Sequence, residues 1–116
     1  MLLSIEDVVT KKINGFVKLK AYFYILGGTN EKAFLSADNN GDFAKIILLP
    51  KKIISQIIEQ DYTFGVLVGG EYAYYAIQSI IKGKIIIINN QQVFNEVDEL
   101  ILMEDGRSQT FTFNYL

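Results

Sequence analysis

Few residues in this chain could do chemistry, because the sequence contains neither histidine nor cysteine. Imidazole bases, histidine metal ligands and thiol nucleophiles are therefore excluded, which leaves carboxylates, lysines and tyrosines for acid–base chemistry. These remaining groups show no recognisable catalytic spacing, and no glycine-rich phosphate loop precedes a helix. We therefore predict a protein that is not an enzyme and that needs neither a cofactor nor a metal ion.

One stripe of residues has the composition of a surface that binds nucleic acid. Lys18, Lys20, Tyr22 and Tyr24 alternate with apolar residues, which places them on one face of a strand. Lysines can follow phosphates and tyrosines can stack on bases, as in many barrels that bind single strands. A solvated face with two packing tyrosines explains the same pattern. The 13 acidic and 11 basic residues, a net charge of −2, also argue against a polyanionic ligand.

Two other groups of residues suit a protein partner. Tyr72 and Tyr74 share one face of an expected strand, and tyrosines are enriched in protein interfaces, although packing at the rim of a sheet explains them equally well. An acidic cluster near the C-terminus could act as a decoy for a basic cleft such as that of a nuclease, or it could be an ordinary solvated edge. This cluster consists of Glu96, Asp98, Glu99, Glu104 and Asp105.

Two short helices are expected among the elements that must position these residues. Ser4 can cap a first helix, and Asp7, three residues later, occupies the N3 position at which a capping box has its acidic residue. A second helix is predicted over residues 51–60, directly after the only proline. Its apolar side chains repeat at helical spacing and should face the core; they are Ile53, Ile54, Ile57 and Ile58.

Alternating apolar and polar residues predict strands over most of the remaining chain. Residues 82–84 and 89–92 are interpreted as a turn and as a polar interruption of the last strand. Asp105 and Gly106 form a typical two-residue turn, so residues 99–103 and 108–115 are expected to pair as a hairpin. The five principal strands are predicted at residues 16–26, 33–38, 44–49, 65–78 and 84–94.

The order of three strands, a helix and two strands is that of a small OB-type barrel. We therefore predict one mostly β domain over residues 1–116, with an OB-like five-stranded barrel and a short N-terminal helix within residues 1–94. The helix lies between the third and fourth strands, and residues 95–116 add a C-terminal hairpin. A mixed α+β sheet is the alternative, because the hairpin could extend the sheet instead of capping it.

Two segments resemble small bacterial OB-type proteins. Residues 4–8 and 15–23 are similar to their opening, in which a short helix feeds a strand of the form G-x-V-x-V-x-G-Y-L, and residues 65–72 are similar to their fourth strand, V-x-V-x-G-x-Y. The resemblance covers residues 4–94 and departs at Ala21, where those proteins usually carry glycine at a bend. It implies a binding barrel and supplies no catalytic residues. Some small acidic chains of this kind are immunity proteins that neutralise a neighbouring cell's toxin.

Together these features predict a non-catalytic module that binds a protein, as an immunity protein binds its cognate toxin. Binding of single-stranded nucleic acid is the first alternative. A structural subunit that pairs with its own copy through residues 110–115 is the second. Because neither a secretory signal nor an apolar stretch of membrane-spanning length is visible, we expect a cytoplasmic protein without a membrane partner.

Overall fold

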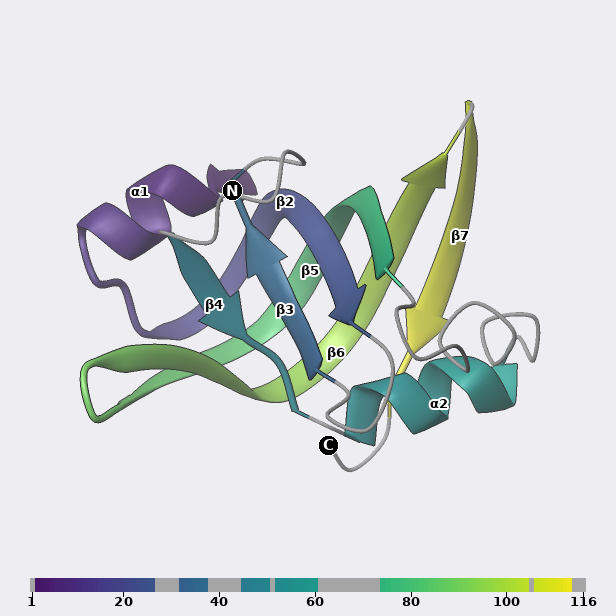
Figure 1. Cartoon of the computed structure of the whole chain (residues 1–116). Helices are drawn as coiled ribbons and strands as arrows, with labels where there is room; N and C mark the ends of the chain where they lie inside the picture. Colours follow the sequence, from purple (N-terminus) through teal and green to yellow (C-terminus); the bar gives the residue numbers. More distant parts are fainter. Residues whose placement is uncertain are drawn as a thin grey trace.

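The computed structural model describes residues 2–26, 32–37, 45–50, 52–60, 74–104 and 106–113, with only the backbone for Ile58, Tyr74 and Tyr75. Residues 65–73 of the predicted fourth strand lie outside these residues. Two helices and seven strands occur in the described part (Figure 1). In chain order they are β1 (Leu2–Ser4), α1 (Ile5–Thr10), β2 (Gly15–Leu26), β3 (Lys32–Ser36), β4 (Ile46–Leu48), α2 (Lys52–Gln60), β5 (Tyr74–Ile88), β6 (Gln91–Glu104) and β7 (Arg107–Thr112).

Five of the strands close into the predicted OB-like barrel. β2 pairs antiparallel with both β3 and β5, β3 pairs antiparallel with β4, and β6 connects β4 to β5. The β4–β6 pairing is parallel, and it completes the circle β2–β3–β4–β6–β5. β1 and β7 extend the sheet beside β2 and β6, so the C-terminal hairpin lengthens the sheet without opening the barrel.

The core fills the barrel from the inward faces of the strands and from one face of α2. Leu19 and Phe23 of β2 are fully buried, and Phe94 and Phe111 pack into the same cluster from β6 and β7. Removing such a side chain from water stabilises the fold by about 1.5–3 kcal/mol. The predicted apolar face of the second helix is confirmed for Ile53, Ile54 and Ile57, which are all buried.

The first helix begins where the sequence predicts. The backbone N–H of Asp7 donates a hydrogen bond to Ser4 Oγ at 3.2 Å, so Ser4 caps the first turn. The buried side chain of Gln92 secures the other end, because its Nε2 donates to the carbonyl oxygens of Val8 at 3.0 Å and Ile13 at 2.7 Å. A glutamine that the sequence places in a polar interruption therefore joins the tip of β6 to α1.

The predicted turn at residues 82–84 is wrong, because Lys82, Gly83 and Lys84 lie inside β5. The register between β5 and β6 shifts between Lys82 and Gly83 and again between Lys84 and Ile85. A Cβ atom at residue 83 would lie 2.1 Å from the backbone oxygen of Glu96. The glycine thus permits a close approach of two strands at a bulge, which the sequence pattern does not distinguish from a turn.

The real turn between β5 and β6 is formed by Asn89 and Asn90. Both residues have positive φ angles, of 51° and 65°, as a two-residue hairpin of type I′ requires. β6 then continues through residues 99–103, which the sequence predicts as a separate strand. The predicted hairpin around Gly106 is confirmed, since β6 and β7 pair antiparallel on either side of it.

Candidate binding surface

Four lysines gather on the outward face of β2 and β5, and we call them the lysine patch: Lys18, Lys20, Lys82 and Lys84. The register places Lys18 directly opposite Lys82. Like charges in that position destabilise an antiparallel sheet. The predicted stripe contains only Lys18 and Lys20 of this patch, because Lys82 and Lys84 fall in the wrongly predicted turn.

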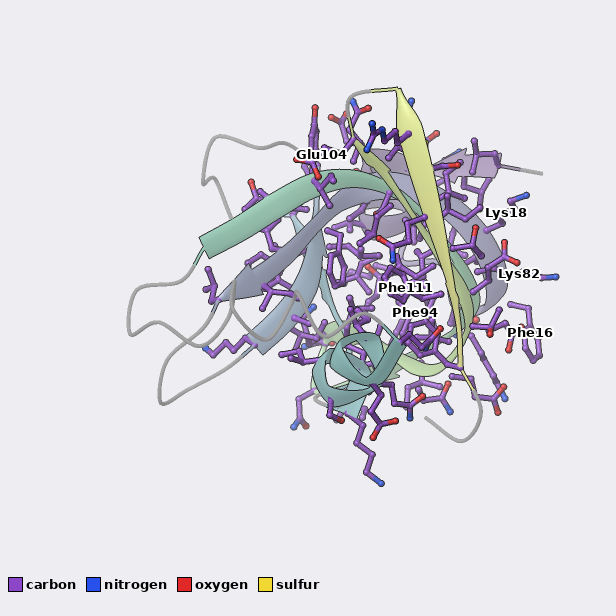
Figure 2. The ribbon with its side chains drawn as sticks, turned by 90° about the vertical axis from the view of Figure 1, so that its right-hand side faces the viewer. Phe16, Lys18, Lys82, Phe94, Glu104 and Phe111 are labelled. Carbon is purple, nitrogen blue, oxygen red and sulfur yellow. The ribbon has the colours of Figure 1, made fainter. Side chains whose placement is uncertain are left out.

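Phe16 is the most exposed aromatic residue among those described, with 70% of its surface accessible. It lies opposite Lys84, whose Nζ is 5.7 Å from the centre of the ring. At so exposed a ring, such a cation–π contact contributes about 0.5 kcal/mol. Figure 2 shows Phe16, Lys18 and Lys82 projecting from the same side of the barrel. Phe16 lies two residues before Lys18, so strand alternation places it on the same polar face, although the predicted stripe does not include it.

The acidic cluster does not form one continuous acidic surface. Three of its carboxylates stand opposite a basic residue in the strand register: Glu96 faces Lys84, Glu99 faces Lys82, and Glu104 faces Arg107. Asp98 is exposed, and it is the additional residue where the register shifts. Glu104 lies at the far end of β6, away from Lys82 (Figure 2). Asp105 lies outside the described residues.

The two tyrosines of the predicted nucleic-acid stripe have different surroundings. Tyr22 is half-buried, and its hydroxyl oxygen accepts a hydrogen bond from Gln78 Nε2 at 3.3 Å. Tyr24 is completely buried, and its ring stacks on Phe34 with centroids 5.1 Å apart and planes inclined by 8°. The prediction that Tyr24 lies on an open face is therefore wrong, and this ring is not accessible to a base.

The other predicted tyrosines give no information about the surface. Tyr72 lies outside the described residues. Tyr74 begins β5 opposite Leu26, but its side chain is outside the described part of the structure.

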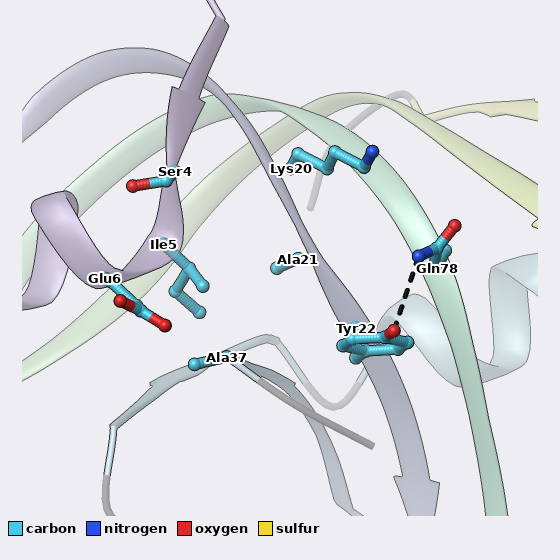
Figure 3. A pocket seen from close by; sticks show the side chains of 8 residues that line it. All are labelled: Ser4, Ile5, Glu6, Lys20, Ala21, Tyr22, Ala37 and Gln78. Carbon is cyan, nitrogen blue, oxygen red and sulfur yellow. Dashed lines mark hydrogen bonds between the residues drawn. The ribbon is translucent and has the colours of Figure 1, made fainter.

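A small pocket of about 210 Å³ lies beside the lysine patch, between the start of α1 and strands β2, β3 and β5 (Figure 3). It is smaller than the sites that hold drug-sized ligands or cofactors, which measure about 300–1,000 Å³. Lys20 and Glu6 line it, so opposite charges are available at its mouth. The remaining lining residues are Ser4, Ile5, Ala21, Tyr22, Ala37 and Gln78.

Comparison with known proteins gives no match to a family model, to a curated protein or to a solved structure. Among the described residues, no group of three or more acidic side chains is placed to hold a metal ion. Neither α1 nor α2 has the length and apolar character of a membrane-spanning helix.

Proposed function

We propose that this protein is a non-catalytic binding module whose ligand is another protein. The supporting observation is the exposure of apolar side chains among charges of both signs. Phe16, Ile88 and Leu2 expose 70%, 50% and 48% of their surfaces, and Leu2 lies beside Lys18. Protein interfaces combine an apolar centre with a charged rim. Nucleic-acid interfaces are far more positive, and the carboxylates of β6 would repel a phosphate backbone.

Within this class we propose an immunity-type inhibitor that acts in the cytoplasm on a bacterial toxin. The small size, the acidic excess and the resemblance to small acidic barrels support this assignment. Glu96 and Asp98 would face basic groups of the toxin, such as those of a nuclease cleft. Lys18 and Lys82 would face a carboxylate of the same partner.

The proposal is tested by titrating the purified chain with the protein encoded beside its gene and by measuring the heat of binding. We expect a one-to-one complex, and we expect Phe16→Ala to weaken it at least about tenfold, as interface aromatics do. Lys52→Ala is the matched control, because Lys52 is exposed on α2 and lies outside the lysine patch. Absence of binding to that protein, and to any protein of the native lysate, would contradict the proposal.

A second candidate function, binding of single-stranded nucleic acid, is supported by Lys18 facing Lys82. A phosphate between the two ammonium groups would offset their repulsion, and Phe16 would replace the buried Tyr24 as the stacking platform. Anisotropy of a labelled oligonucleotide across a salt series tests it. Lys18→Ala should lower the slope of log K against log salt by about 0.7, the value for one lost contact to a single strand. No binding at low salt would eliminate this candidate.

A further inference from the structure

The outer edge of β7 has no strand partner among the described residues, since β7 pairs only with β6. The backbone N–H of Phe113 donates to the carbonyl oxygen of Asp98 on β6 at 3.3 Å. Because alternate residues of a strand direct their backbone groups to opposite sides, those of Ser108, Thr110 and Thr112 point away from β6. All three residues are exposed, so this edge is a template for a further strand.

A side chain of α2 already occupies one of these three positions. Gln60 Nε2 donates to the carbonyl oxygen of Thr112 at 2.9 Å, and Gln60 Oε1 accepts from the N–H of Thr112 at 3.3 Å. These are the two hydrogen bonds that a residue of a neighbouring strand would make. No described residue caps Ser108 or Thr110 in this way, so within the described part of the chain two of the three positions carry no such cap.

We propose that this edge pairs antiparallel with the same edge of a second copy of this chain, and that the Gln60 amide competes with that pairing. A register centred on Thr110 places Ser108 of one copy opposite Thr112 of the other. Every outward backbone group is then used, once Gln60 releases Thr112. On one face of the pair Ser108 lies opposite Thr112 and Thr110 opposite Thr110, and such cross-strand pairs are favourable, while on the other face Gln109 lies opposite Phe111.

The composition of the edge favours a second copy as the occupant. Residues 108–112 contain no charge and no proline, the features by which edge strands usually prevent self-pairing. In the register centred on Thr110, Arg107 would face the uncharged Phe113 of the other copy, so no like charges meet. Among the described residues, the Gln60 amide is therefore the group that competes with strand pairing at this edge.

Three substitutions separate the proposed contact from other contacts. Gln60→Ala removes the competing amide from both copies and should tighten self-association about a hundredfold, which is about tenfold for each amide at one to two net hydrogen bonds. Gln56→Ala is the matched control, because it deletes an amide one turn earlier on the same helix and has no bond to Thr112. Thr110→Pro removes an outward N–H and should abolish association, while proline is tolerated on this side of an edge strand.

Sedimentation velocity of the full chain over a concentration series provides the measurement, with hydrogen exchange at Ser108 and Thr110 as the local readout. We expect a concentration-dependent dimer that is enhanced by Gln60→Ala, unaffected by Gln56→Ala and lost in Thr110→Pro, with protected amides at both residues in the dimer. Monomers at every concentration for both the native chain and Gln60→Ala would overturn the proposal. So would a dimer that persists in Thr110→Pro, because the contact would then lie elsewhere.

Folding of Gln60→Ala is checked by its thermal unfolding, and Gln60→Glu provides a second variant. The carboxylate keeps an acceptor for the N–H of Thr112 but loses the donor to its carbonyl oxygen. An intermediate gain in association is expected from it. Association weaker than in the native chain would contradict competition by the amide.

Discussion

The outward face of β2 has two halves with the same alternating pattern and different surroundings. In the first half Phe16, Lys18 and Lys20 are exposed, and like charges meet across the strand pair. In the second half Tyr22 is half-buried with a hydrogen bond, and Tyr24 is buried against Phe34. The like charges of the first half oppose stability, although Glu99 faces Lys82 from β6, whereas the buried rings of the second half contribute to stability.

The largest effect on stability should come from a substitution in the buried half of the outward face of β2. Tyr24→Ala removes a fully buried ring and its stack on Phe34, so we expect the free energy of unfolding to fall by about 3–5 kcal/mol. Urea denaturation followed by circular dichroism measures it. Tyr22→Ala is the matched control and should cost much less, because that ring is half-exposed. Equal losses for the two tyrosines would remove the distinction between the halves.

A smaller loss of stability is expected from a change at Gly83 of β5, which lies between Lys82 and Lys84 of the lysine patch. Gly83→Ala would place a Cβ atom against the backbone oxygen of Glu96, so the strands must separate at the bulge. We expect a loss of about 1–3 kcal/mol, as for other overpacked positions. Gly106→Ala provides a contrast, since nothing lies within 4 Å of a Cβ there and only its positive φ of 75° opposes the substitution. Native-like stability of Gly83→Ala would show that the bulge is not tightly packed.

A gain in stability is expected when one of the two facing lysines, Lys18 and Lys82, is replaced by an acidic residue. Lys18→Glu places a carboxylate opposite Lys82, which should stabilise the fold by about 0.2–1 kcal/mol at low salt. The gain should shrink as salt is added, because both groups are exposed and screened. Lys32→Glu is the control, since Lys32 lies opposite the uncharged Leu26. A loss of stability in Lys18→Glu would show that the lysines do not repel one another.

The smallest effect on stability is expected for Phe16, the residue that the proposed interface needs most. Because its ring is 70% exposed, Phe16→Ala should change the free energy of unfolding by no more than about 0.5 kcal/mol. Thermal unfolding and partner binding are measured on the same preparation. A destabilisation comparable to that of Tyr24→Ala would make Phe16 a packing residue and would weaken the argument for an interface.

The sequence predicts the closed barrel better than its individual turns. The strand and helix order follows from local periodicity, which is why the OB-like architecture and the cap at Ser4 are confirmed. The bulge at Gly83 and the turn at Asn89–Asn90 are interchanged in the prediction, because glycine and asparagine both mark breaks in a strand. Whether a glycine serves a turn or a close approach depends on the strand beside it, and the local sequence carries no information about that neighbour.

The sequence predicts those residues of the candidate site whose position follows from the alternation of side chains along a single strand. Alternation places Lys18 and Lys20 outward, but it cannot show that Lys82 joins them or that Glu99 faces Lys82 from the other side. These contacts depend on the register between strands that are distant in the chain, and register is set by bulges and turns. For the same reason the sequence cannot show that Glu96, Glu99 and Glu104 each lie opposite a basic residue.

The sequence by itself determined the mostly β character, the absence of imidazole and thiol chemistry, and the inward faces of β2 and α2, since composition and periodicity act locally. Only the tertiary structure decided that Tyr24 is buried, that Lys18 faces Lys82 and that Gln60 caps Thr112. Each of these contacts joins elements far apart in the chain, and closing the barrel fixes which residues meet.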